Sequence, residues 1–210
     1  CGEEPCPCEE DSISTFQGTD EIRQCTLAEP AEIQGHAVGA NLVYFDADGN
    51  LVQYIAGREQ TLDGIPCQAK QVQLHSNGNL RACMATEDLE VKGYSCRGSQ
   101  MVYLTENGSF MGCRLTEEAT FDGIVVPPRA TAIVRDGSLY RTHAWGDPVE
   151  AGDLRCTGKA FFHPNGQPGE CELAEPATIG GTSFAEGDRV CMDAGGAVVE
   201  CSVLDWDQTI

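Results

Sequence analysis

Short runs that alternate apolar and polar residues recur along the chain, and short turn sequences separate them in pairs. Typical first runs are NLVYF, KQVQL and QMVYL, and typical second runs are NLRACMA, SFMGCRL and QPGECEL. Alternation with a period of two is typical of β-strands that bury one face. No stretch sustains the apolar period of 3.6 residues that predicts a long helix. The pattern therefore predicts an all-β protein built from hairpins.

Glycines that follow a turn-forming residue reveal a repeat with a period of 29 or 30 residues. They are Gly49, Gly78, Gly108, Gly137, Gly166 and Gly195. Asn or Asp precedes five of these six glycines. Such pairs favour a type I′ hairpin turn, in which both central residues have positive φ. The predicted turns are Asp48-Gly49, Asn77-Gly78, Asn107-Gly108, Asp136-Gly137 and Asn165-Gly166.

Each repeat also carries a third segment, in which an apolar residue is followed by any residue and glycine, as in Ile33-Gln34-Gly35. The sequence leaves open whether this segment joins the main sheet or forms a second one. Repeats of this kind bury a hydrophobic face by stacking on their neighbours. We predict an elongated antiparallel β-repeat array, solenoid-like or an open twisted sheet, with about seven repeats in a single domain over residues 19–210. An acidic tether containing Cys and Pro is predicted over residues 1–18.

The repeat also predicts how the cysteines pair. One cysteine position follows the third segment, and a second lies in the second run of the hairpin. Copies that lack a cysteine at one position also lack it at the other, as Val38 with Tyr54 and Val126 with Thr142 show. The predicted disulfides are Cys67–Cys83, Cys96–Cys113 and Cys156–Cys171, with Cys191–Cys201 in the last copy and Cys8–Cys25 in the first.

Disulfides also fit the number and spacing of the cysteines. Each predicted bridge closes a loop of roughly 10–17 residues and contributes about 2–3 kcal/mol in the chain-entropy model. A sheet with little core per repeat benefits from such cross-links. Zinc binding is the alternative, but no Cys-x₂-Cys pair exists. Twelve cysteines in 210 residues indicate an oxidising, extracytoplasmic compartment.

The first residues, CGEEPCPCEED, resemble the start of a processed bacterial lipoprotein, whose first residue is a lipid-modified cysteine followed by an acidic tether. This resemblance implies a bacterial cell-surface location, with a lipid on Cys1 as the one attachment to the outer membrane. Cys6 is then an odd thiol, free or bonded to another chain. The alternative is a local Cys1–Cys6 disulfide, and the sequence does not decide between the two.

Two hairpins, LHSNGNL at 74–80 and FHPNGQP at 162–168, resemble the MORN-type repeats of bacterial proteins. The resemblance covers residues 20–205. It implies hairpins stacked into a long, twisted antiparallel sheet, and a scaffolding role.

Several functions are disfavoured by composition and motifs. The net charge of −20, from 13 Lys and Arg against 33 Asp and Glu, repels phosphate backbones and argues against a nucleic-acid partner. None of the common catalytic or phosphate-binding motifs is present. His75 and His163 occupy equivalent places, but three repeats separate them by about 29 Å in an open sheet, too far to share a metal ion. We therefore predict no catalytic residue, no metal site, no cofactor and no enzymatic activity.

Two non-enzymatic functions remain. The first is a structural protein that assembles with itself head to tail into a cell-surface fibre, because the end of an uncapped repeat array invites strand pairing. The residues predicted to make this contact are Val198, Val199, Val203, Leu204 and Trp206. The second is a monomeric surface-anchored module that binds a protein or glycan through aromatic residues on one sheet face. The candidate aromatics, which in the alternative form the thin core, are Tyr44, Tyr54, Tyr103, Tyr140, Trp145 and Phe162.

Overall fold

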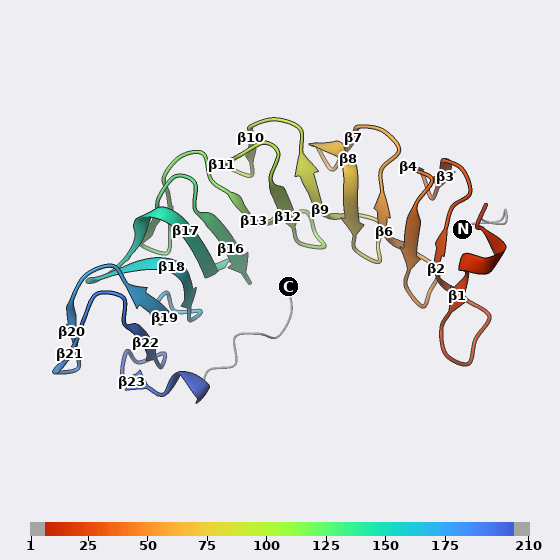
Figure 1. Ribbon diagram of the computed structural model, residues 1–210. Coiled ribbons are helices and arrows are strands. Elements are labelled where there is room, and N and C mark those ends of the chain that lie inside the picture. Colours follow the sequence, from red (N-terminus) through yellow and green to blue (C-terminus); the bar gives the residue numbers. More distant parts are fainter. Residues whose placement is uncertain (1–6, 204–210) are drawn as a thin grey trace. The chain divides into compact units, whose positions relative to one another are not determined.

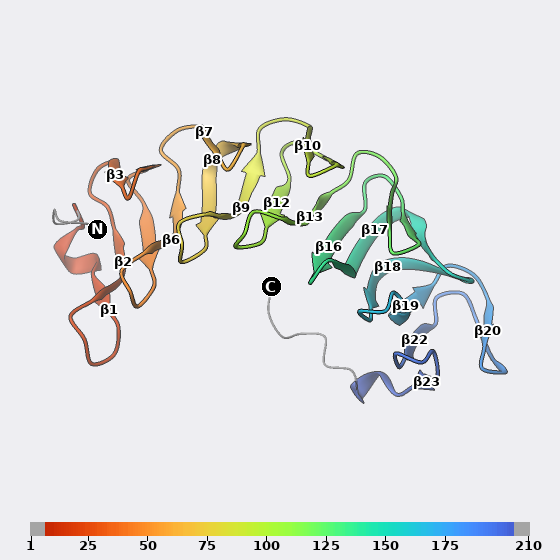
Figure 2. The ribbon, with the colours of Figure 1, turned by 180° about the vertical axis from the view of Figure 1, so that it is seen from behind.

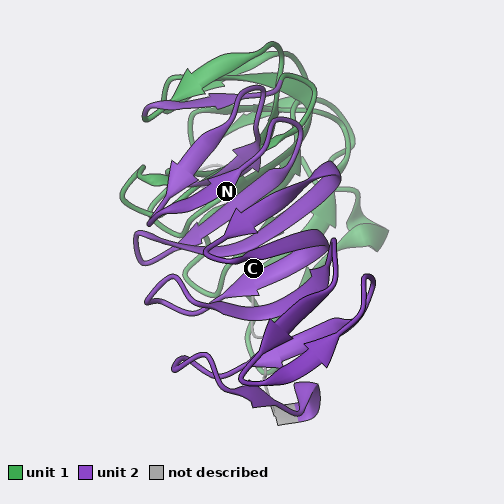
Figure 3. Cartoon of the chain, turned by 90° about the vertical axis from the view of Figure 1, so that its left-hand side faces the viewer, with its two compact units in different colours: residues 1–92, 98–110 green, residues 93–97, 111–210 purple. Residues whose placement is uncertain are grey.

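The structure is a computed structural model that describes residues 7–203 (Figures 1 and 2). Over these residues it contains 23 strands and two short 3₁₀ helices, η1 (Glu10–Ser12) and η2 (Cys201–Val203), so the all-β prediction is confirmed. The chain divides into two compact units (Figure 3). Unit 1 comprises Cys1–Lys92 and Gly98–Phe110, and unit 2 comprises Gly93–Arg97 and Met111–Ile210. Within the described residues, no helix is long and apolar enough to cross a membrane.

Unit 1 contains an antiparallel main sheet in which each strand pairs with the next main strand along the chain. Its order is β1, β2, β5, β6, β8, β9, β12. The strands of the unit are β1 (Ser14–Thr15), β2 (Ile22–Thr26), β3 (Ala31–Ile33), β4 (His36–Val38), β5 (Leu42–Phe45), β6 (Leu51–Ile55), β7 (Gln60–Leu62), β8 (Ile65–Leu74), β9 (Leu80–Ala85), β10 (Leu89–Val91) and β12 (Met101–Leu104).

Unit 2 repeats this plan in the order β13, β16, β17, β18, β19, β22, β23. Its strands are β11 (Tyr94–Cys96), β13 (Phe110–Arg114), β14 (Ala119–Phe121), β15 (Ile124–Val126), β16 (Thr131–Arg135), β17 (Ser138–Ala151), β18 (Leu154–Phe162), β19 (Pro168–Leu173), β20 (Ala177–Ile179), β21 (Thr182–Phe184), β22 (Arg189–Met192) and β23 (Val198–Val199). The first residue of β13, Phe110, belongs to unit 1.

The third segments form small, tight hairpins. At their tips both central residues have positive φ, as in Gln34 (51°) and Gly35 (83°), which is the geometry of a type I′ turn. The hairpins β3–β4 and β20–β21 are separate two-stranded sheets, whereas β7–β8 and β14–β15 connect to the main sheets. Both arrangements left open by the sequence therefore occur.

The predicted type I′ geometry is wrong for four of the five Asx-Gly turns, which lie in the loops 46–50, 75–79, 105–109 and 163–167. In each of these loops only the glycine has positive φ. In the second loop, the His75 amide donates to the Asn79 carbonyl at 2.8 Å and the Gly78 amide to the His75 carbonyl at 2.9 Å. This is a three-residue loop, a type I turn followed by a left-handed glycine.

In three of these loops the side chain before the glycine explains the difference, and in the loop 46–50 Asp46 Oδ1 accepts from the Asp48 and Asn50 amides instead. Asn77 Oδ1 accepts a hydrogen bond from the Asn79 amide at 3.0 Å, an Asx turn that keeps Asn77 itself at negative φ. Only Asp136-Gly137 has the predicted geometry, with positive φ at both residues. There the turn is two residues long, because Arg135 pairs directly with Ser138.

One face of each main sheet forms the core. In unit 1, Cys25, Val43, Tyr54, Val72, Cys83 and Val102 point to this face, and all are fully buried. In unit 2, Cys113, Ala132, Thr142 and Ala160 do the same. The small hairpins contribute the other side of the core with buried residues such as Ile33, Val38 and Ile65.

All five predicted disulfides are present: Cys8–Cys25, Cys67–Cys83, Cys96–Cys113, Cys156–Cys171 and Cys191–Cys201. The three central bridges join a small hairpin to a strand of the main sheet. Cys8 lies in the segment that was predicted as a tether. Residues 8–15 nevertheless belong to the fold, because the backbone of Cys8 forms an isolated β-bridge with Leu27 and β1 pairs with β2. Cys1 and Cys6 lie outside the described residues, so the lipid and the local disulfide both stay predictions.

Two repeats fill the cysteine positions with other residues. In unit 1, the Tyr54 hydroxyl accepts a hydrogen bond from Gln60 Nε2 at 2.9 Å and lies 3.3 Å from His36 Nδ1. Burial raises the pKa of Tyr54, so it remains a neutral phenol. In unit 2, Thr142 Oγ1 is buried without a hydrogen-bond partner among the described residues. Thr142 is therefore a weak point of the core.

The Thr142→Val variant should be more stable than the parent. Valine keeps the shape of the side chain and removes the unpaired hydroxyl, so we expect the free energy of unfolding to rise by about 1–2 kcal/mol. Urea unfolding followed by circular dichroism measures the change. Thr120→Val, at an exposed position of β14, is the control and should change stability by less than about 0.5 kcal/mol. A loss of stability in Thr142→Val would contradict this account of the core.

The same repeat should accept a new disulfide. By equivalence with Cys96–Cys113, the double variant Val126→Cys/Thr142→Cys should oxidise spontaneously and add up to about 3 kcal/mol of stability. Alkylation without reduction, followed by mass spectrometry, should find no more free thiol than in the parent. The single Thr142→Cys variant should show one additional thiol. An unreacted pair would mean that this repeat does not superpose on its neighbours.

Candidate functional site

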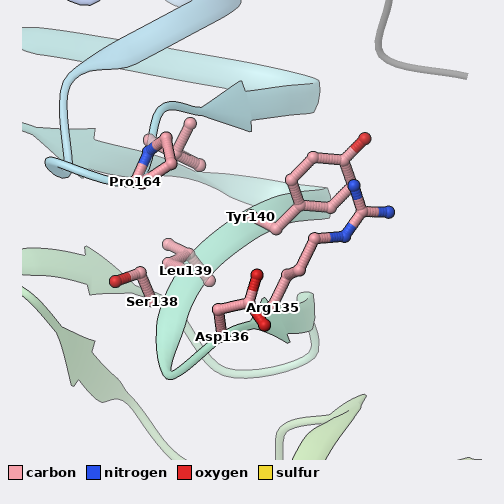
Figure 4. Close-up of a pocket in the computed structure, with 7 residues that line it drawn as sticks. Arg135, Asp136, Ser138, Leu139, Tyr140 and Pro164 are labelled. Atoms are coloured by element: carbon pink, nitrogen blue, oxygen red, sulfur yellow. The ribbon is translucent and has the colours of Figure 1, made fainter. Parts of the chain in front are cut away.

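The described cavity is too small to hold a substrate. A hollow of about 80 Å³ lies at the β16–β17 turn, and its lining includes Leu139, Tyr140, Phe162 and Pro164. Figure 4 shows Leu139, Tyr140 and Pro164 around it. Ligand pockets usually enclose at least about 300 Å³. This hollow is therefore a poor candidate for a ligand site.

The recurring His-x-Asn-Gly sequence has a structural role. His75 Nε2 donates to the Leu104 carbonyl at 3.0 Å, and His163 Nε2 donates to the Met192 carbonyl at 2.8 Å. Each acceptor lies 29 residues further along the chain, in the next hairpin. Asn77 likewise donates to the tip of the following hairpin. Over residues 7–203, no group of three His, Cys, Asp or Glu residues is placed to hold a metal ion.

The six candidate aromatics do not share one environment. Tyr54 and Phe162 are core residues with at most 1% exposure. Tyr44, Tyr103 and Tyr140 are half-buried, and Trp145 is 55% exposed. Part of the aromatic set thus forms the core, and the rest lies at the surface.

The surface of the main sheet in unit 1 carries two rows of side chains that we name the tyrosine–glutamine face. Strand pairing places Gln24, Tyr44, Gln53, Gln73, Ala82 and Tyr103 in the first row. The second row lies two residues away along each strand and contains Thr26, Leu42, Ile55, Gln71, Met84 and Met101. All of these residues except Ala82 are half-buried or exposed. The face is therefore open to solvent.

The tyrosine–glutamine face contains no charged residue in either row, although the chain has 46 charged residues among 210. One cation borders it, since Lys70 Nζ lies 3.4 Å from Met84 Sδ. The first row crosses six strands, a length of roughly 24 Å at the usual strand spacing. Glutamine amides both donate and accept hydrogen bonds, and tyrosine combines an apolar ring with a hydroxyl. Such a face suits a long, uncharged ligand with many hydroxyl groups that lies across the strands.

The open face of unit 2 is different, and we name its central feature the cation–aromatic strip. Strand pairing places Arg114, Thr131, His143 and Lys159 in one row across β13, β16, β17 and β18. The strip consists of Arg114, Trp145, His143, Lys159, Phe161, Tyr140 and Arg135.

Ring contacts connect the members of the strip. The Arg114 guanidinium carbon lies 4.7 Å from the centre of the Trp145 ring, and the His143 and Trp145 ring centres are 3.9 Å apart. Lys159 Nζ lies 5.4 Å from the centre of the Phe161 ring. These distances are typical of cation–π and aromatic contacts. The contacts hold the cations in place at the surface.

Trp145 begins an irregular stretch of β17. The pairing of β17 with β18 is interrupted between Ala144 and Val149, where residues 145–148 have the sequence Trp-Gly-Asp-Pro. Proline cannot donate to the sheet, and unpaired residues of this kind form a bulge that redirects a side chain. Trp145 lies two residues after His143 and therefore on the same face, and it is 55% exposed at the start of the bulge.

The electrostatic field in the strip is positive. Partial burial is the largest cause that lowers the pKa of His143, and the positive charges of Lys159, Arg141 and Arg114 lower it further. His143 is therefore neutral at pH 7. Arg114, Arg141 and Lys159 form no ion pair with any residue that the structure describes. These three cations thus lack a counter-ion among the described residues.

The residues predicted for self-association lie at the end of unit 2. Val198 and Val199 form β23, which pairs with β22, and Val198 is 40% exposed. Val203 ends η2, whereas Leu204 and Trp206 lie outside the described residues. The structure does not test whether these residues contact a second copy of the chain.

Comparisons with known proteins do not assign a family. No protein-family model matches the chain, and no curated protein and no solved structure is similar to it. The resemblances to MORN-type repeats and to bacterial lipoproteins therefore stay predictions.

The sequence analysis missed the cations of the strip and the glutamines of the tyrosine–glutamine face. A signal was present, since Arg141, His143 and Trp145 are spaced two residues apart and follow the polar face of their strand. Their grouping with Arg114 and Lys159 depends on the register between strands, which the sequence alone did not provide.

His143 should titrate below its ordinary pKa of about 6.5. Since its folded pKa is lowered, its contribution to stability is present above pH 6.5 and is lost as the pH falls through the folded value. Nuclear magnetic resonance of ¹⁵N-labelled histidine measures the midpoint. Lys159→Gln should raise the midpoint by removing a positive charge, whereas Lys159→Arg should leave it low. A parent midpoint at or above 6.5 would contradict the positive field.

Proposed function

We propose that the protein is a non-enzymatic, extracytoplasmic binding module, and that the tyrosine–glutamine face of unit 1 binds an uncharged glycan chain. The observation that carries this proposal is the absence of charge from two rows of open-face residues in a chain with a net charge of −20. Sheet surfaces exposed without function usually carry charged residues, which keep a protein soluble.

A glycan fits this face better than a peptide does. Peptides that bind sheets usually add a strand at an edge, where backbone groups are free. The backbone groups in the middle of the tyrosine–glutamine face are already paired between strands. Side-chain amides, hydroxyls and flat rings remain for the ligand, and sugar hydroxyls and ring faces complement them.

The surroundings of the protein agree with this proposal. Five disulfides indicate an oxidising, extracytoplasmic environment. Extracellular glycans are accessible there. Attachment to a bacterial surface through Cys1 is part of the proposal.

Head-to-tail assembly into a fibre is the second candidate function. The terminal strands β1 and β23 each pair with one strand among the described residues, so each has an outer edge at which a second copy can pair. Each of these strands is two residues long, however. Short edge strands are a common means of preventing association, which is why we rank this function second.

Binding to neutral hexasaccharides tests the proposed function. We expect cellohexaose, chitohexaose or maltohexaose to bind the purified, oxidised protein in isothermal titration calorimetry. Tyr103→Ala and Gln73→Ala should each weaken binding by about tenfold, as expected for the loss of about 1.4 kcal/mol of contact. Gln100→Ala, which lies outside both rows, is the matched control and should bind as the parent does.

Negative-stain electron microscopy of the same sample separates the two candidates. Dispersed single chains that bind a hexasaccharide support the binding module. Regular fibres in a sample that binds none of the three sugars would favour head-to-tail assembly instead.

A further inference from the structure

We propose that the cation–aromatic strip of unit 2 is a second, separate site that binds an acidic oligosaccharide, with carboxylates at Arg114 and Lys159 and apolar contact from Trp145. This inference goes beyond the proposed function, because it concerns another surface and a ligand of opposite character. It rests on the geometry of the strip, on its charge and on the exposure of Trp145.

The geometry provides two cationic positions on either side of an aromatic one. Arg114 and Lys159 are on β13 and β18, and His143 lies in the same row between them on β17. Three strand spacings, about 14 Å, separate the backbone positions of the two cations. A single small anion does not span this distance, whereas a chain with an acidic group on successive sugars does.

The two cations that the proposal uses, Arg114 and Lys159, form no ion pair within the described residues. Arg114 Nε donates to the Arg129 carbonyl at 2.8 Å, which fixes the guanidinium and leaves its terminal nitrogens to other acceptors. Glu170 and Glu172 lie on β19 beside the Lys159 segment of β18, but neither forms an ion pair with Lys159, and Asp147 is exposed and forms none within the described part of the chain. By contrast, Arg155 and Arg189 are paired with Glu175 and Glu170, at 3.2 and 2.9 Å.

Charge complementarity selects an anionic occupant. Arg114, Arg141 and Lys159 gather on one surface of a chain that has only 13 Lys and Arg residues against 33 acidic ones. An anion is attracted locally, because charges more than about 8 Å away are screened at physiological ionic strength. A long polyanion also meets the acidic remainder of the protein, so a short acidic oligosaccharide fits better than a nucleic acid.

The exposed tryptophan distinguishes a sugar from a simple anion. Trp145 is 55% exposed in the middle of the strip, and an apolar ring contributes nothing to holding a phosphate or sulfate ion. Sugars present apolar C–H faces together with polar groups, which an indole ring and neighbouring cations can both contact. The combination therefore indicates an acidic sugar.

Fluorescence titration with tetragalacturonate tests the proposal. In a Trp206→Phe background, Trp145 is the remaining tryptophan, so its emission reports the strip. We expect a saturable change with tetragalacturonate that weakens as salt rises. Methyl-esterified tetragalacturonate, which lacks only the charges, should bind at least about tenfold more weakly, as expected when charged hydrogen bonds are lost. Inorganic phosphate should produce no saturable change.

Calorimetry of single-residue variants tests which residues contribute to tetragalacturonate binding. Arg114→Gln and Lys159→Gln should each weaken tetragalacturonate binding by about tenfold, and Trp145→Ala should weaken it for the acid without making the ester bind. Arg155→Gln is the matched control and should bind as the parent does, with unchanged melting temperatures verifying the fold of all variants. The proposal would be overturned if tetragalacturonate did not bind, or if its methyl ester or inorganic phosphate bound equally well. It would also be overturned if both glutamine variants retained full binding.

Discussion

The link between each small hairpin and the main sheet is the constraint on which the rest of the structure depends. A single sheet has no second layer of its own, and a three-residue strand buries little apolar surface. In three repeats a buried disulfide makes the link, with Cα atoms 5.3–5.8 Å apart. Where cysteines are missing, Tyr54 makes it through a buried phenol bonded to Gln60, and Thr142 supplies a hydroxyl that finds no partner among the described residues. Equivalent positions in the repeats thus carry a disulfide, a hydrogen-bonded tyrosine or a threonine whose hydroxyl has no partner among the described residues.

This arrangement commits only one face of each sheet to the core. The small hairpins cover that face, and the other face stays open across six strands in unit 1. Because the disulfides and the hairpin-to-hairpin bonds of His75 and His163 hold the repeats together, residues on the open face contribute little to stability. They are free to differ between repeats. The open faces of the two units differ accordingly, with amides and phenols in unit 1 and cations around one exposed ring, Trp145, in unit 2.

Features that depend on spacing within one repeat could be predicted from the sequence. The period, the strands and the five disulfide pairs all follow from positions that recur. The repeat that has Val38 and Tyr54 lacks cysteine at both positions, and this was enough to choose which cysteines pair. Features that depend on side chains hydrogen-bonding to their own turn, or on the register between strands, could not be predicted from the sequence. The side chain of Asn77 caps its own turn and thereby changes the turn type. The cation–aromatic strip required the pairing of His143 with Lys159, which comes from the register between β17 and β18 and not from any motif.

Carboxylates are absent from both rows of the tyrosine–glutamine face and from the cation–aromatic strip. An acidic surface keeps a protein soluble and monomeric at little structural cost, so carboxylates are the easiest residues to place on an exposed strand. The chain has 33 of them, yet neither row of the tyrosine–glutamine face includes one, and the members of the cation–aromatic strip include none. Folding does not require this exclusion, because both surfaces lie opposite the core. The proposed ligands would account for it, since a carboxylate on either face would repel an acidic sugar or be desolvated without a partner by a neutral one. The two faces are therefore best understood as selected for what they contact outside the chain.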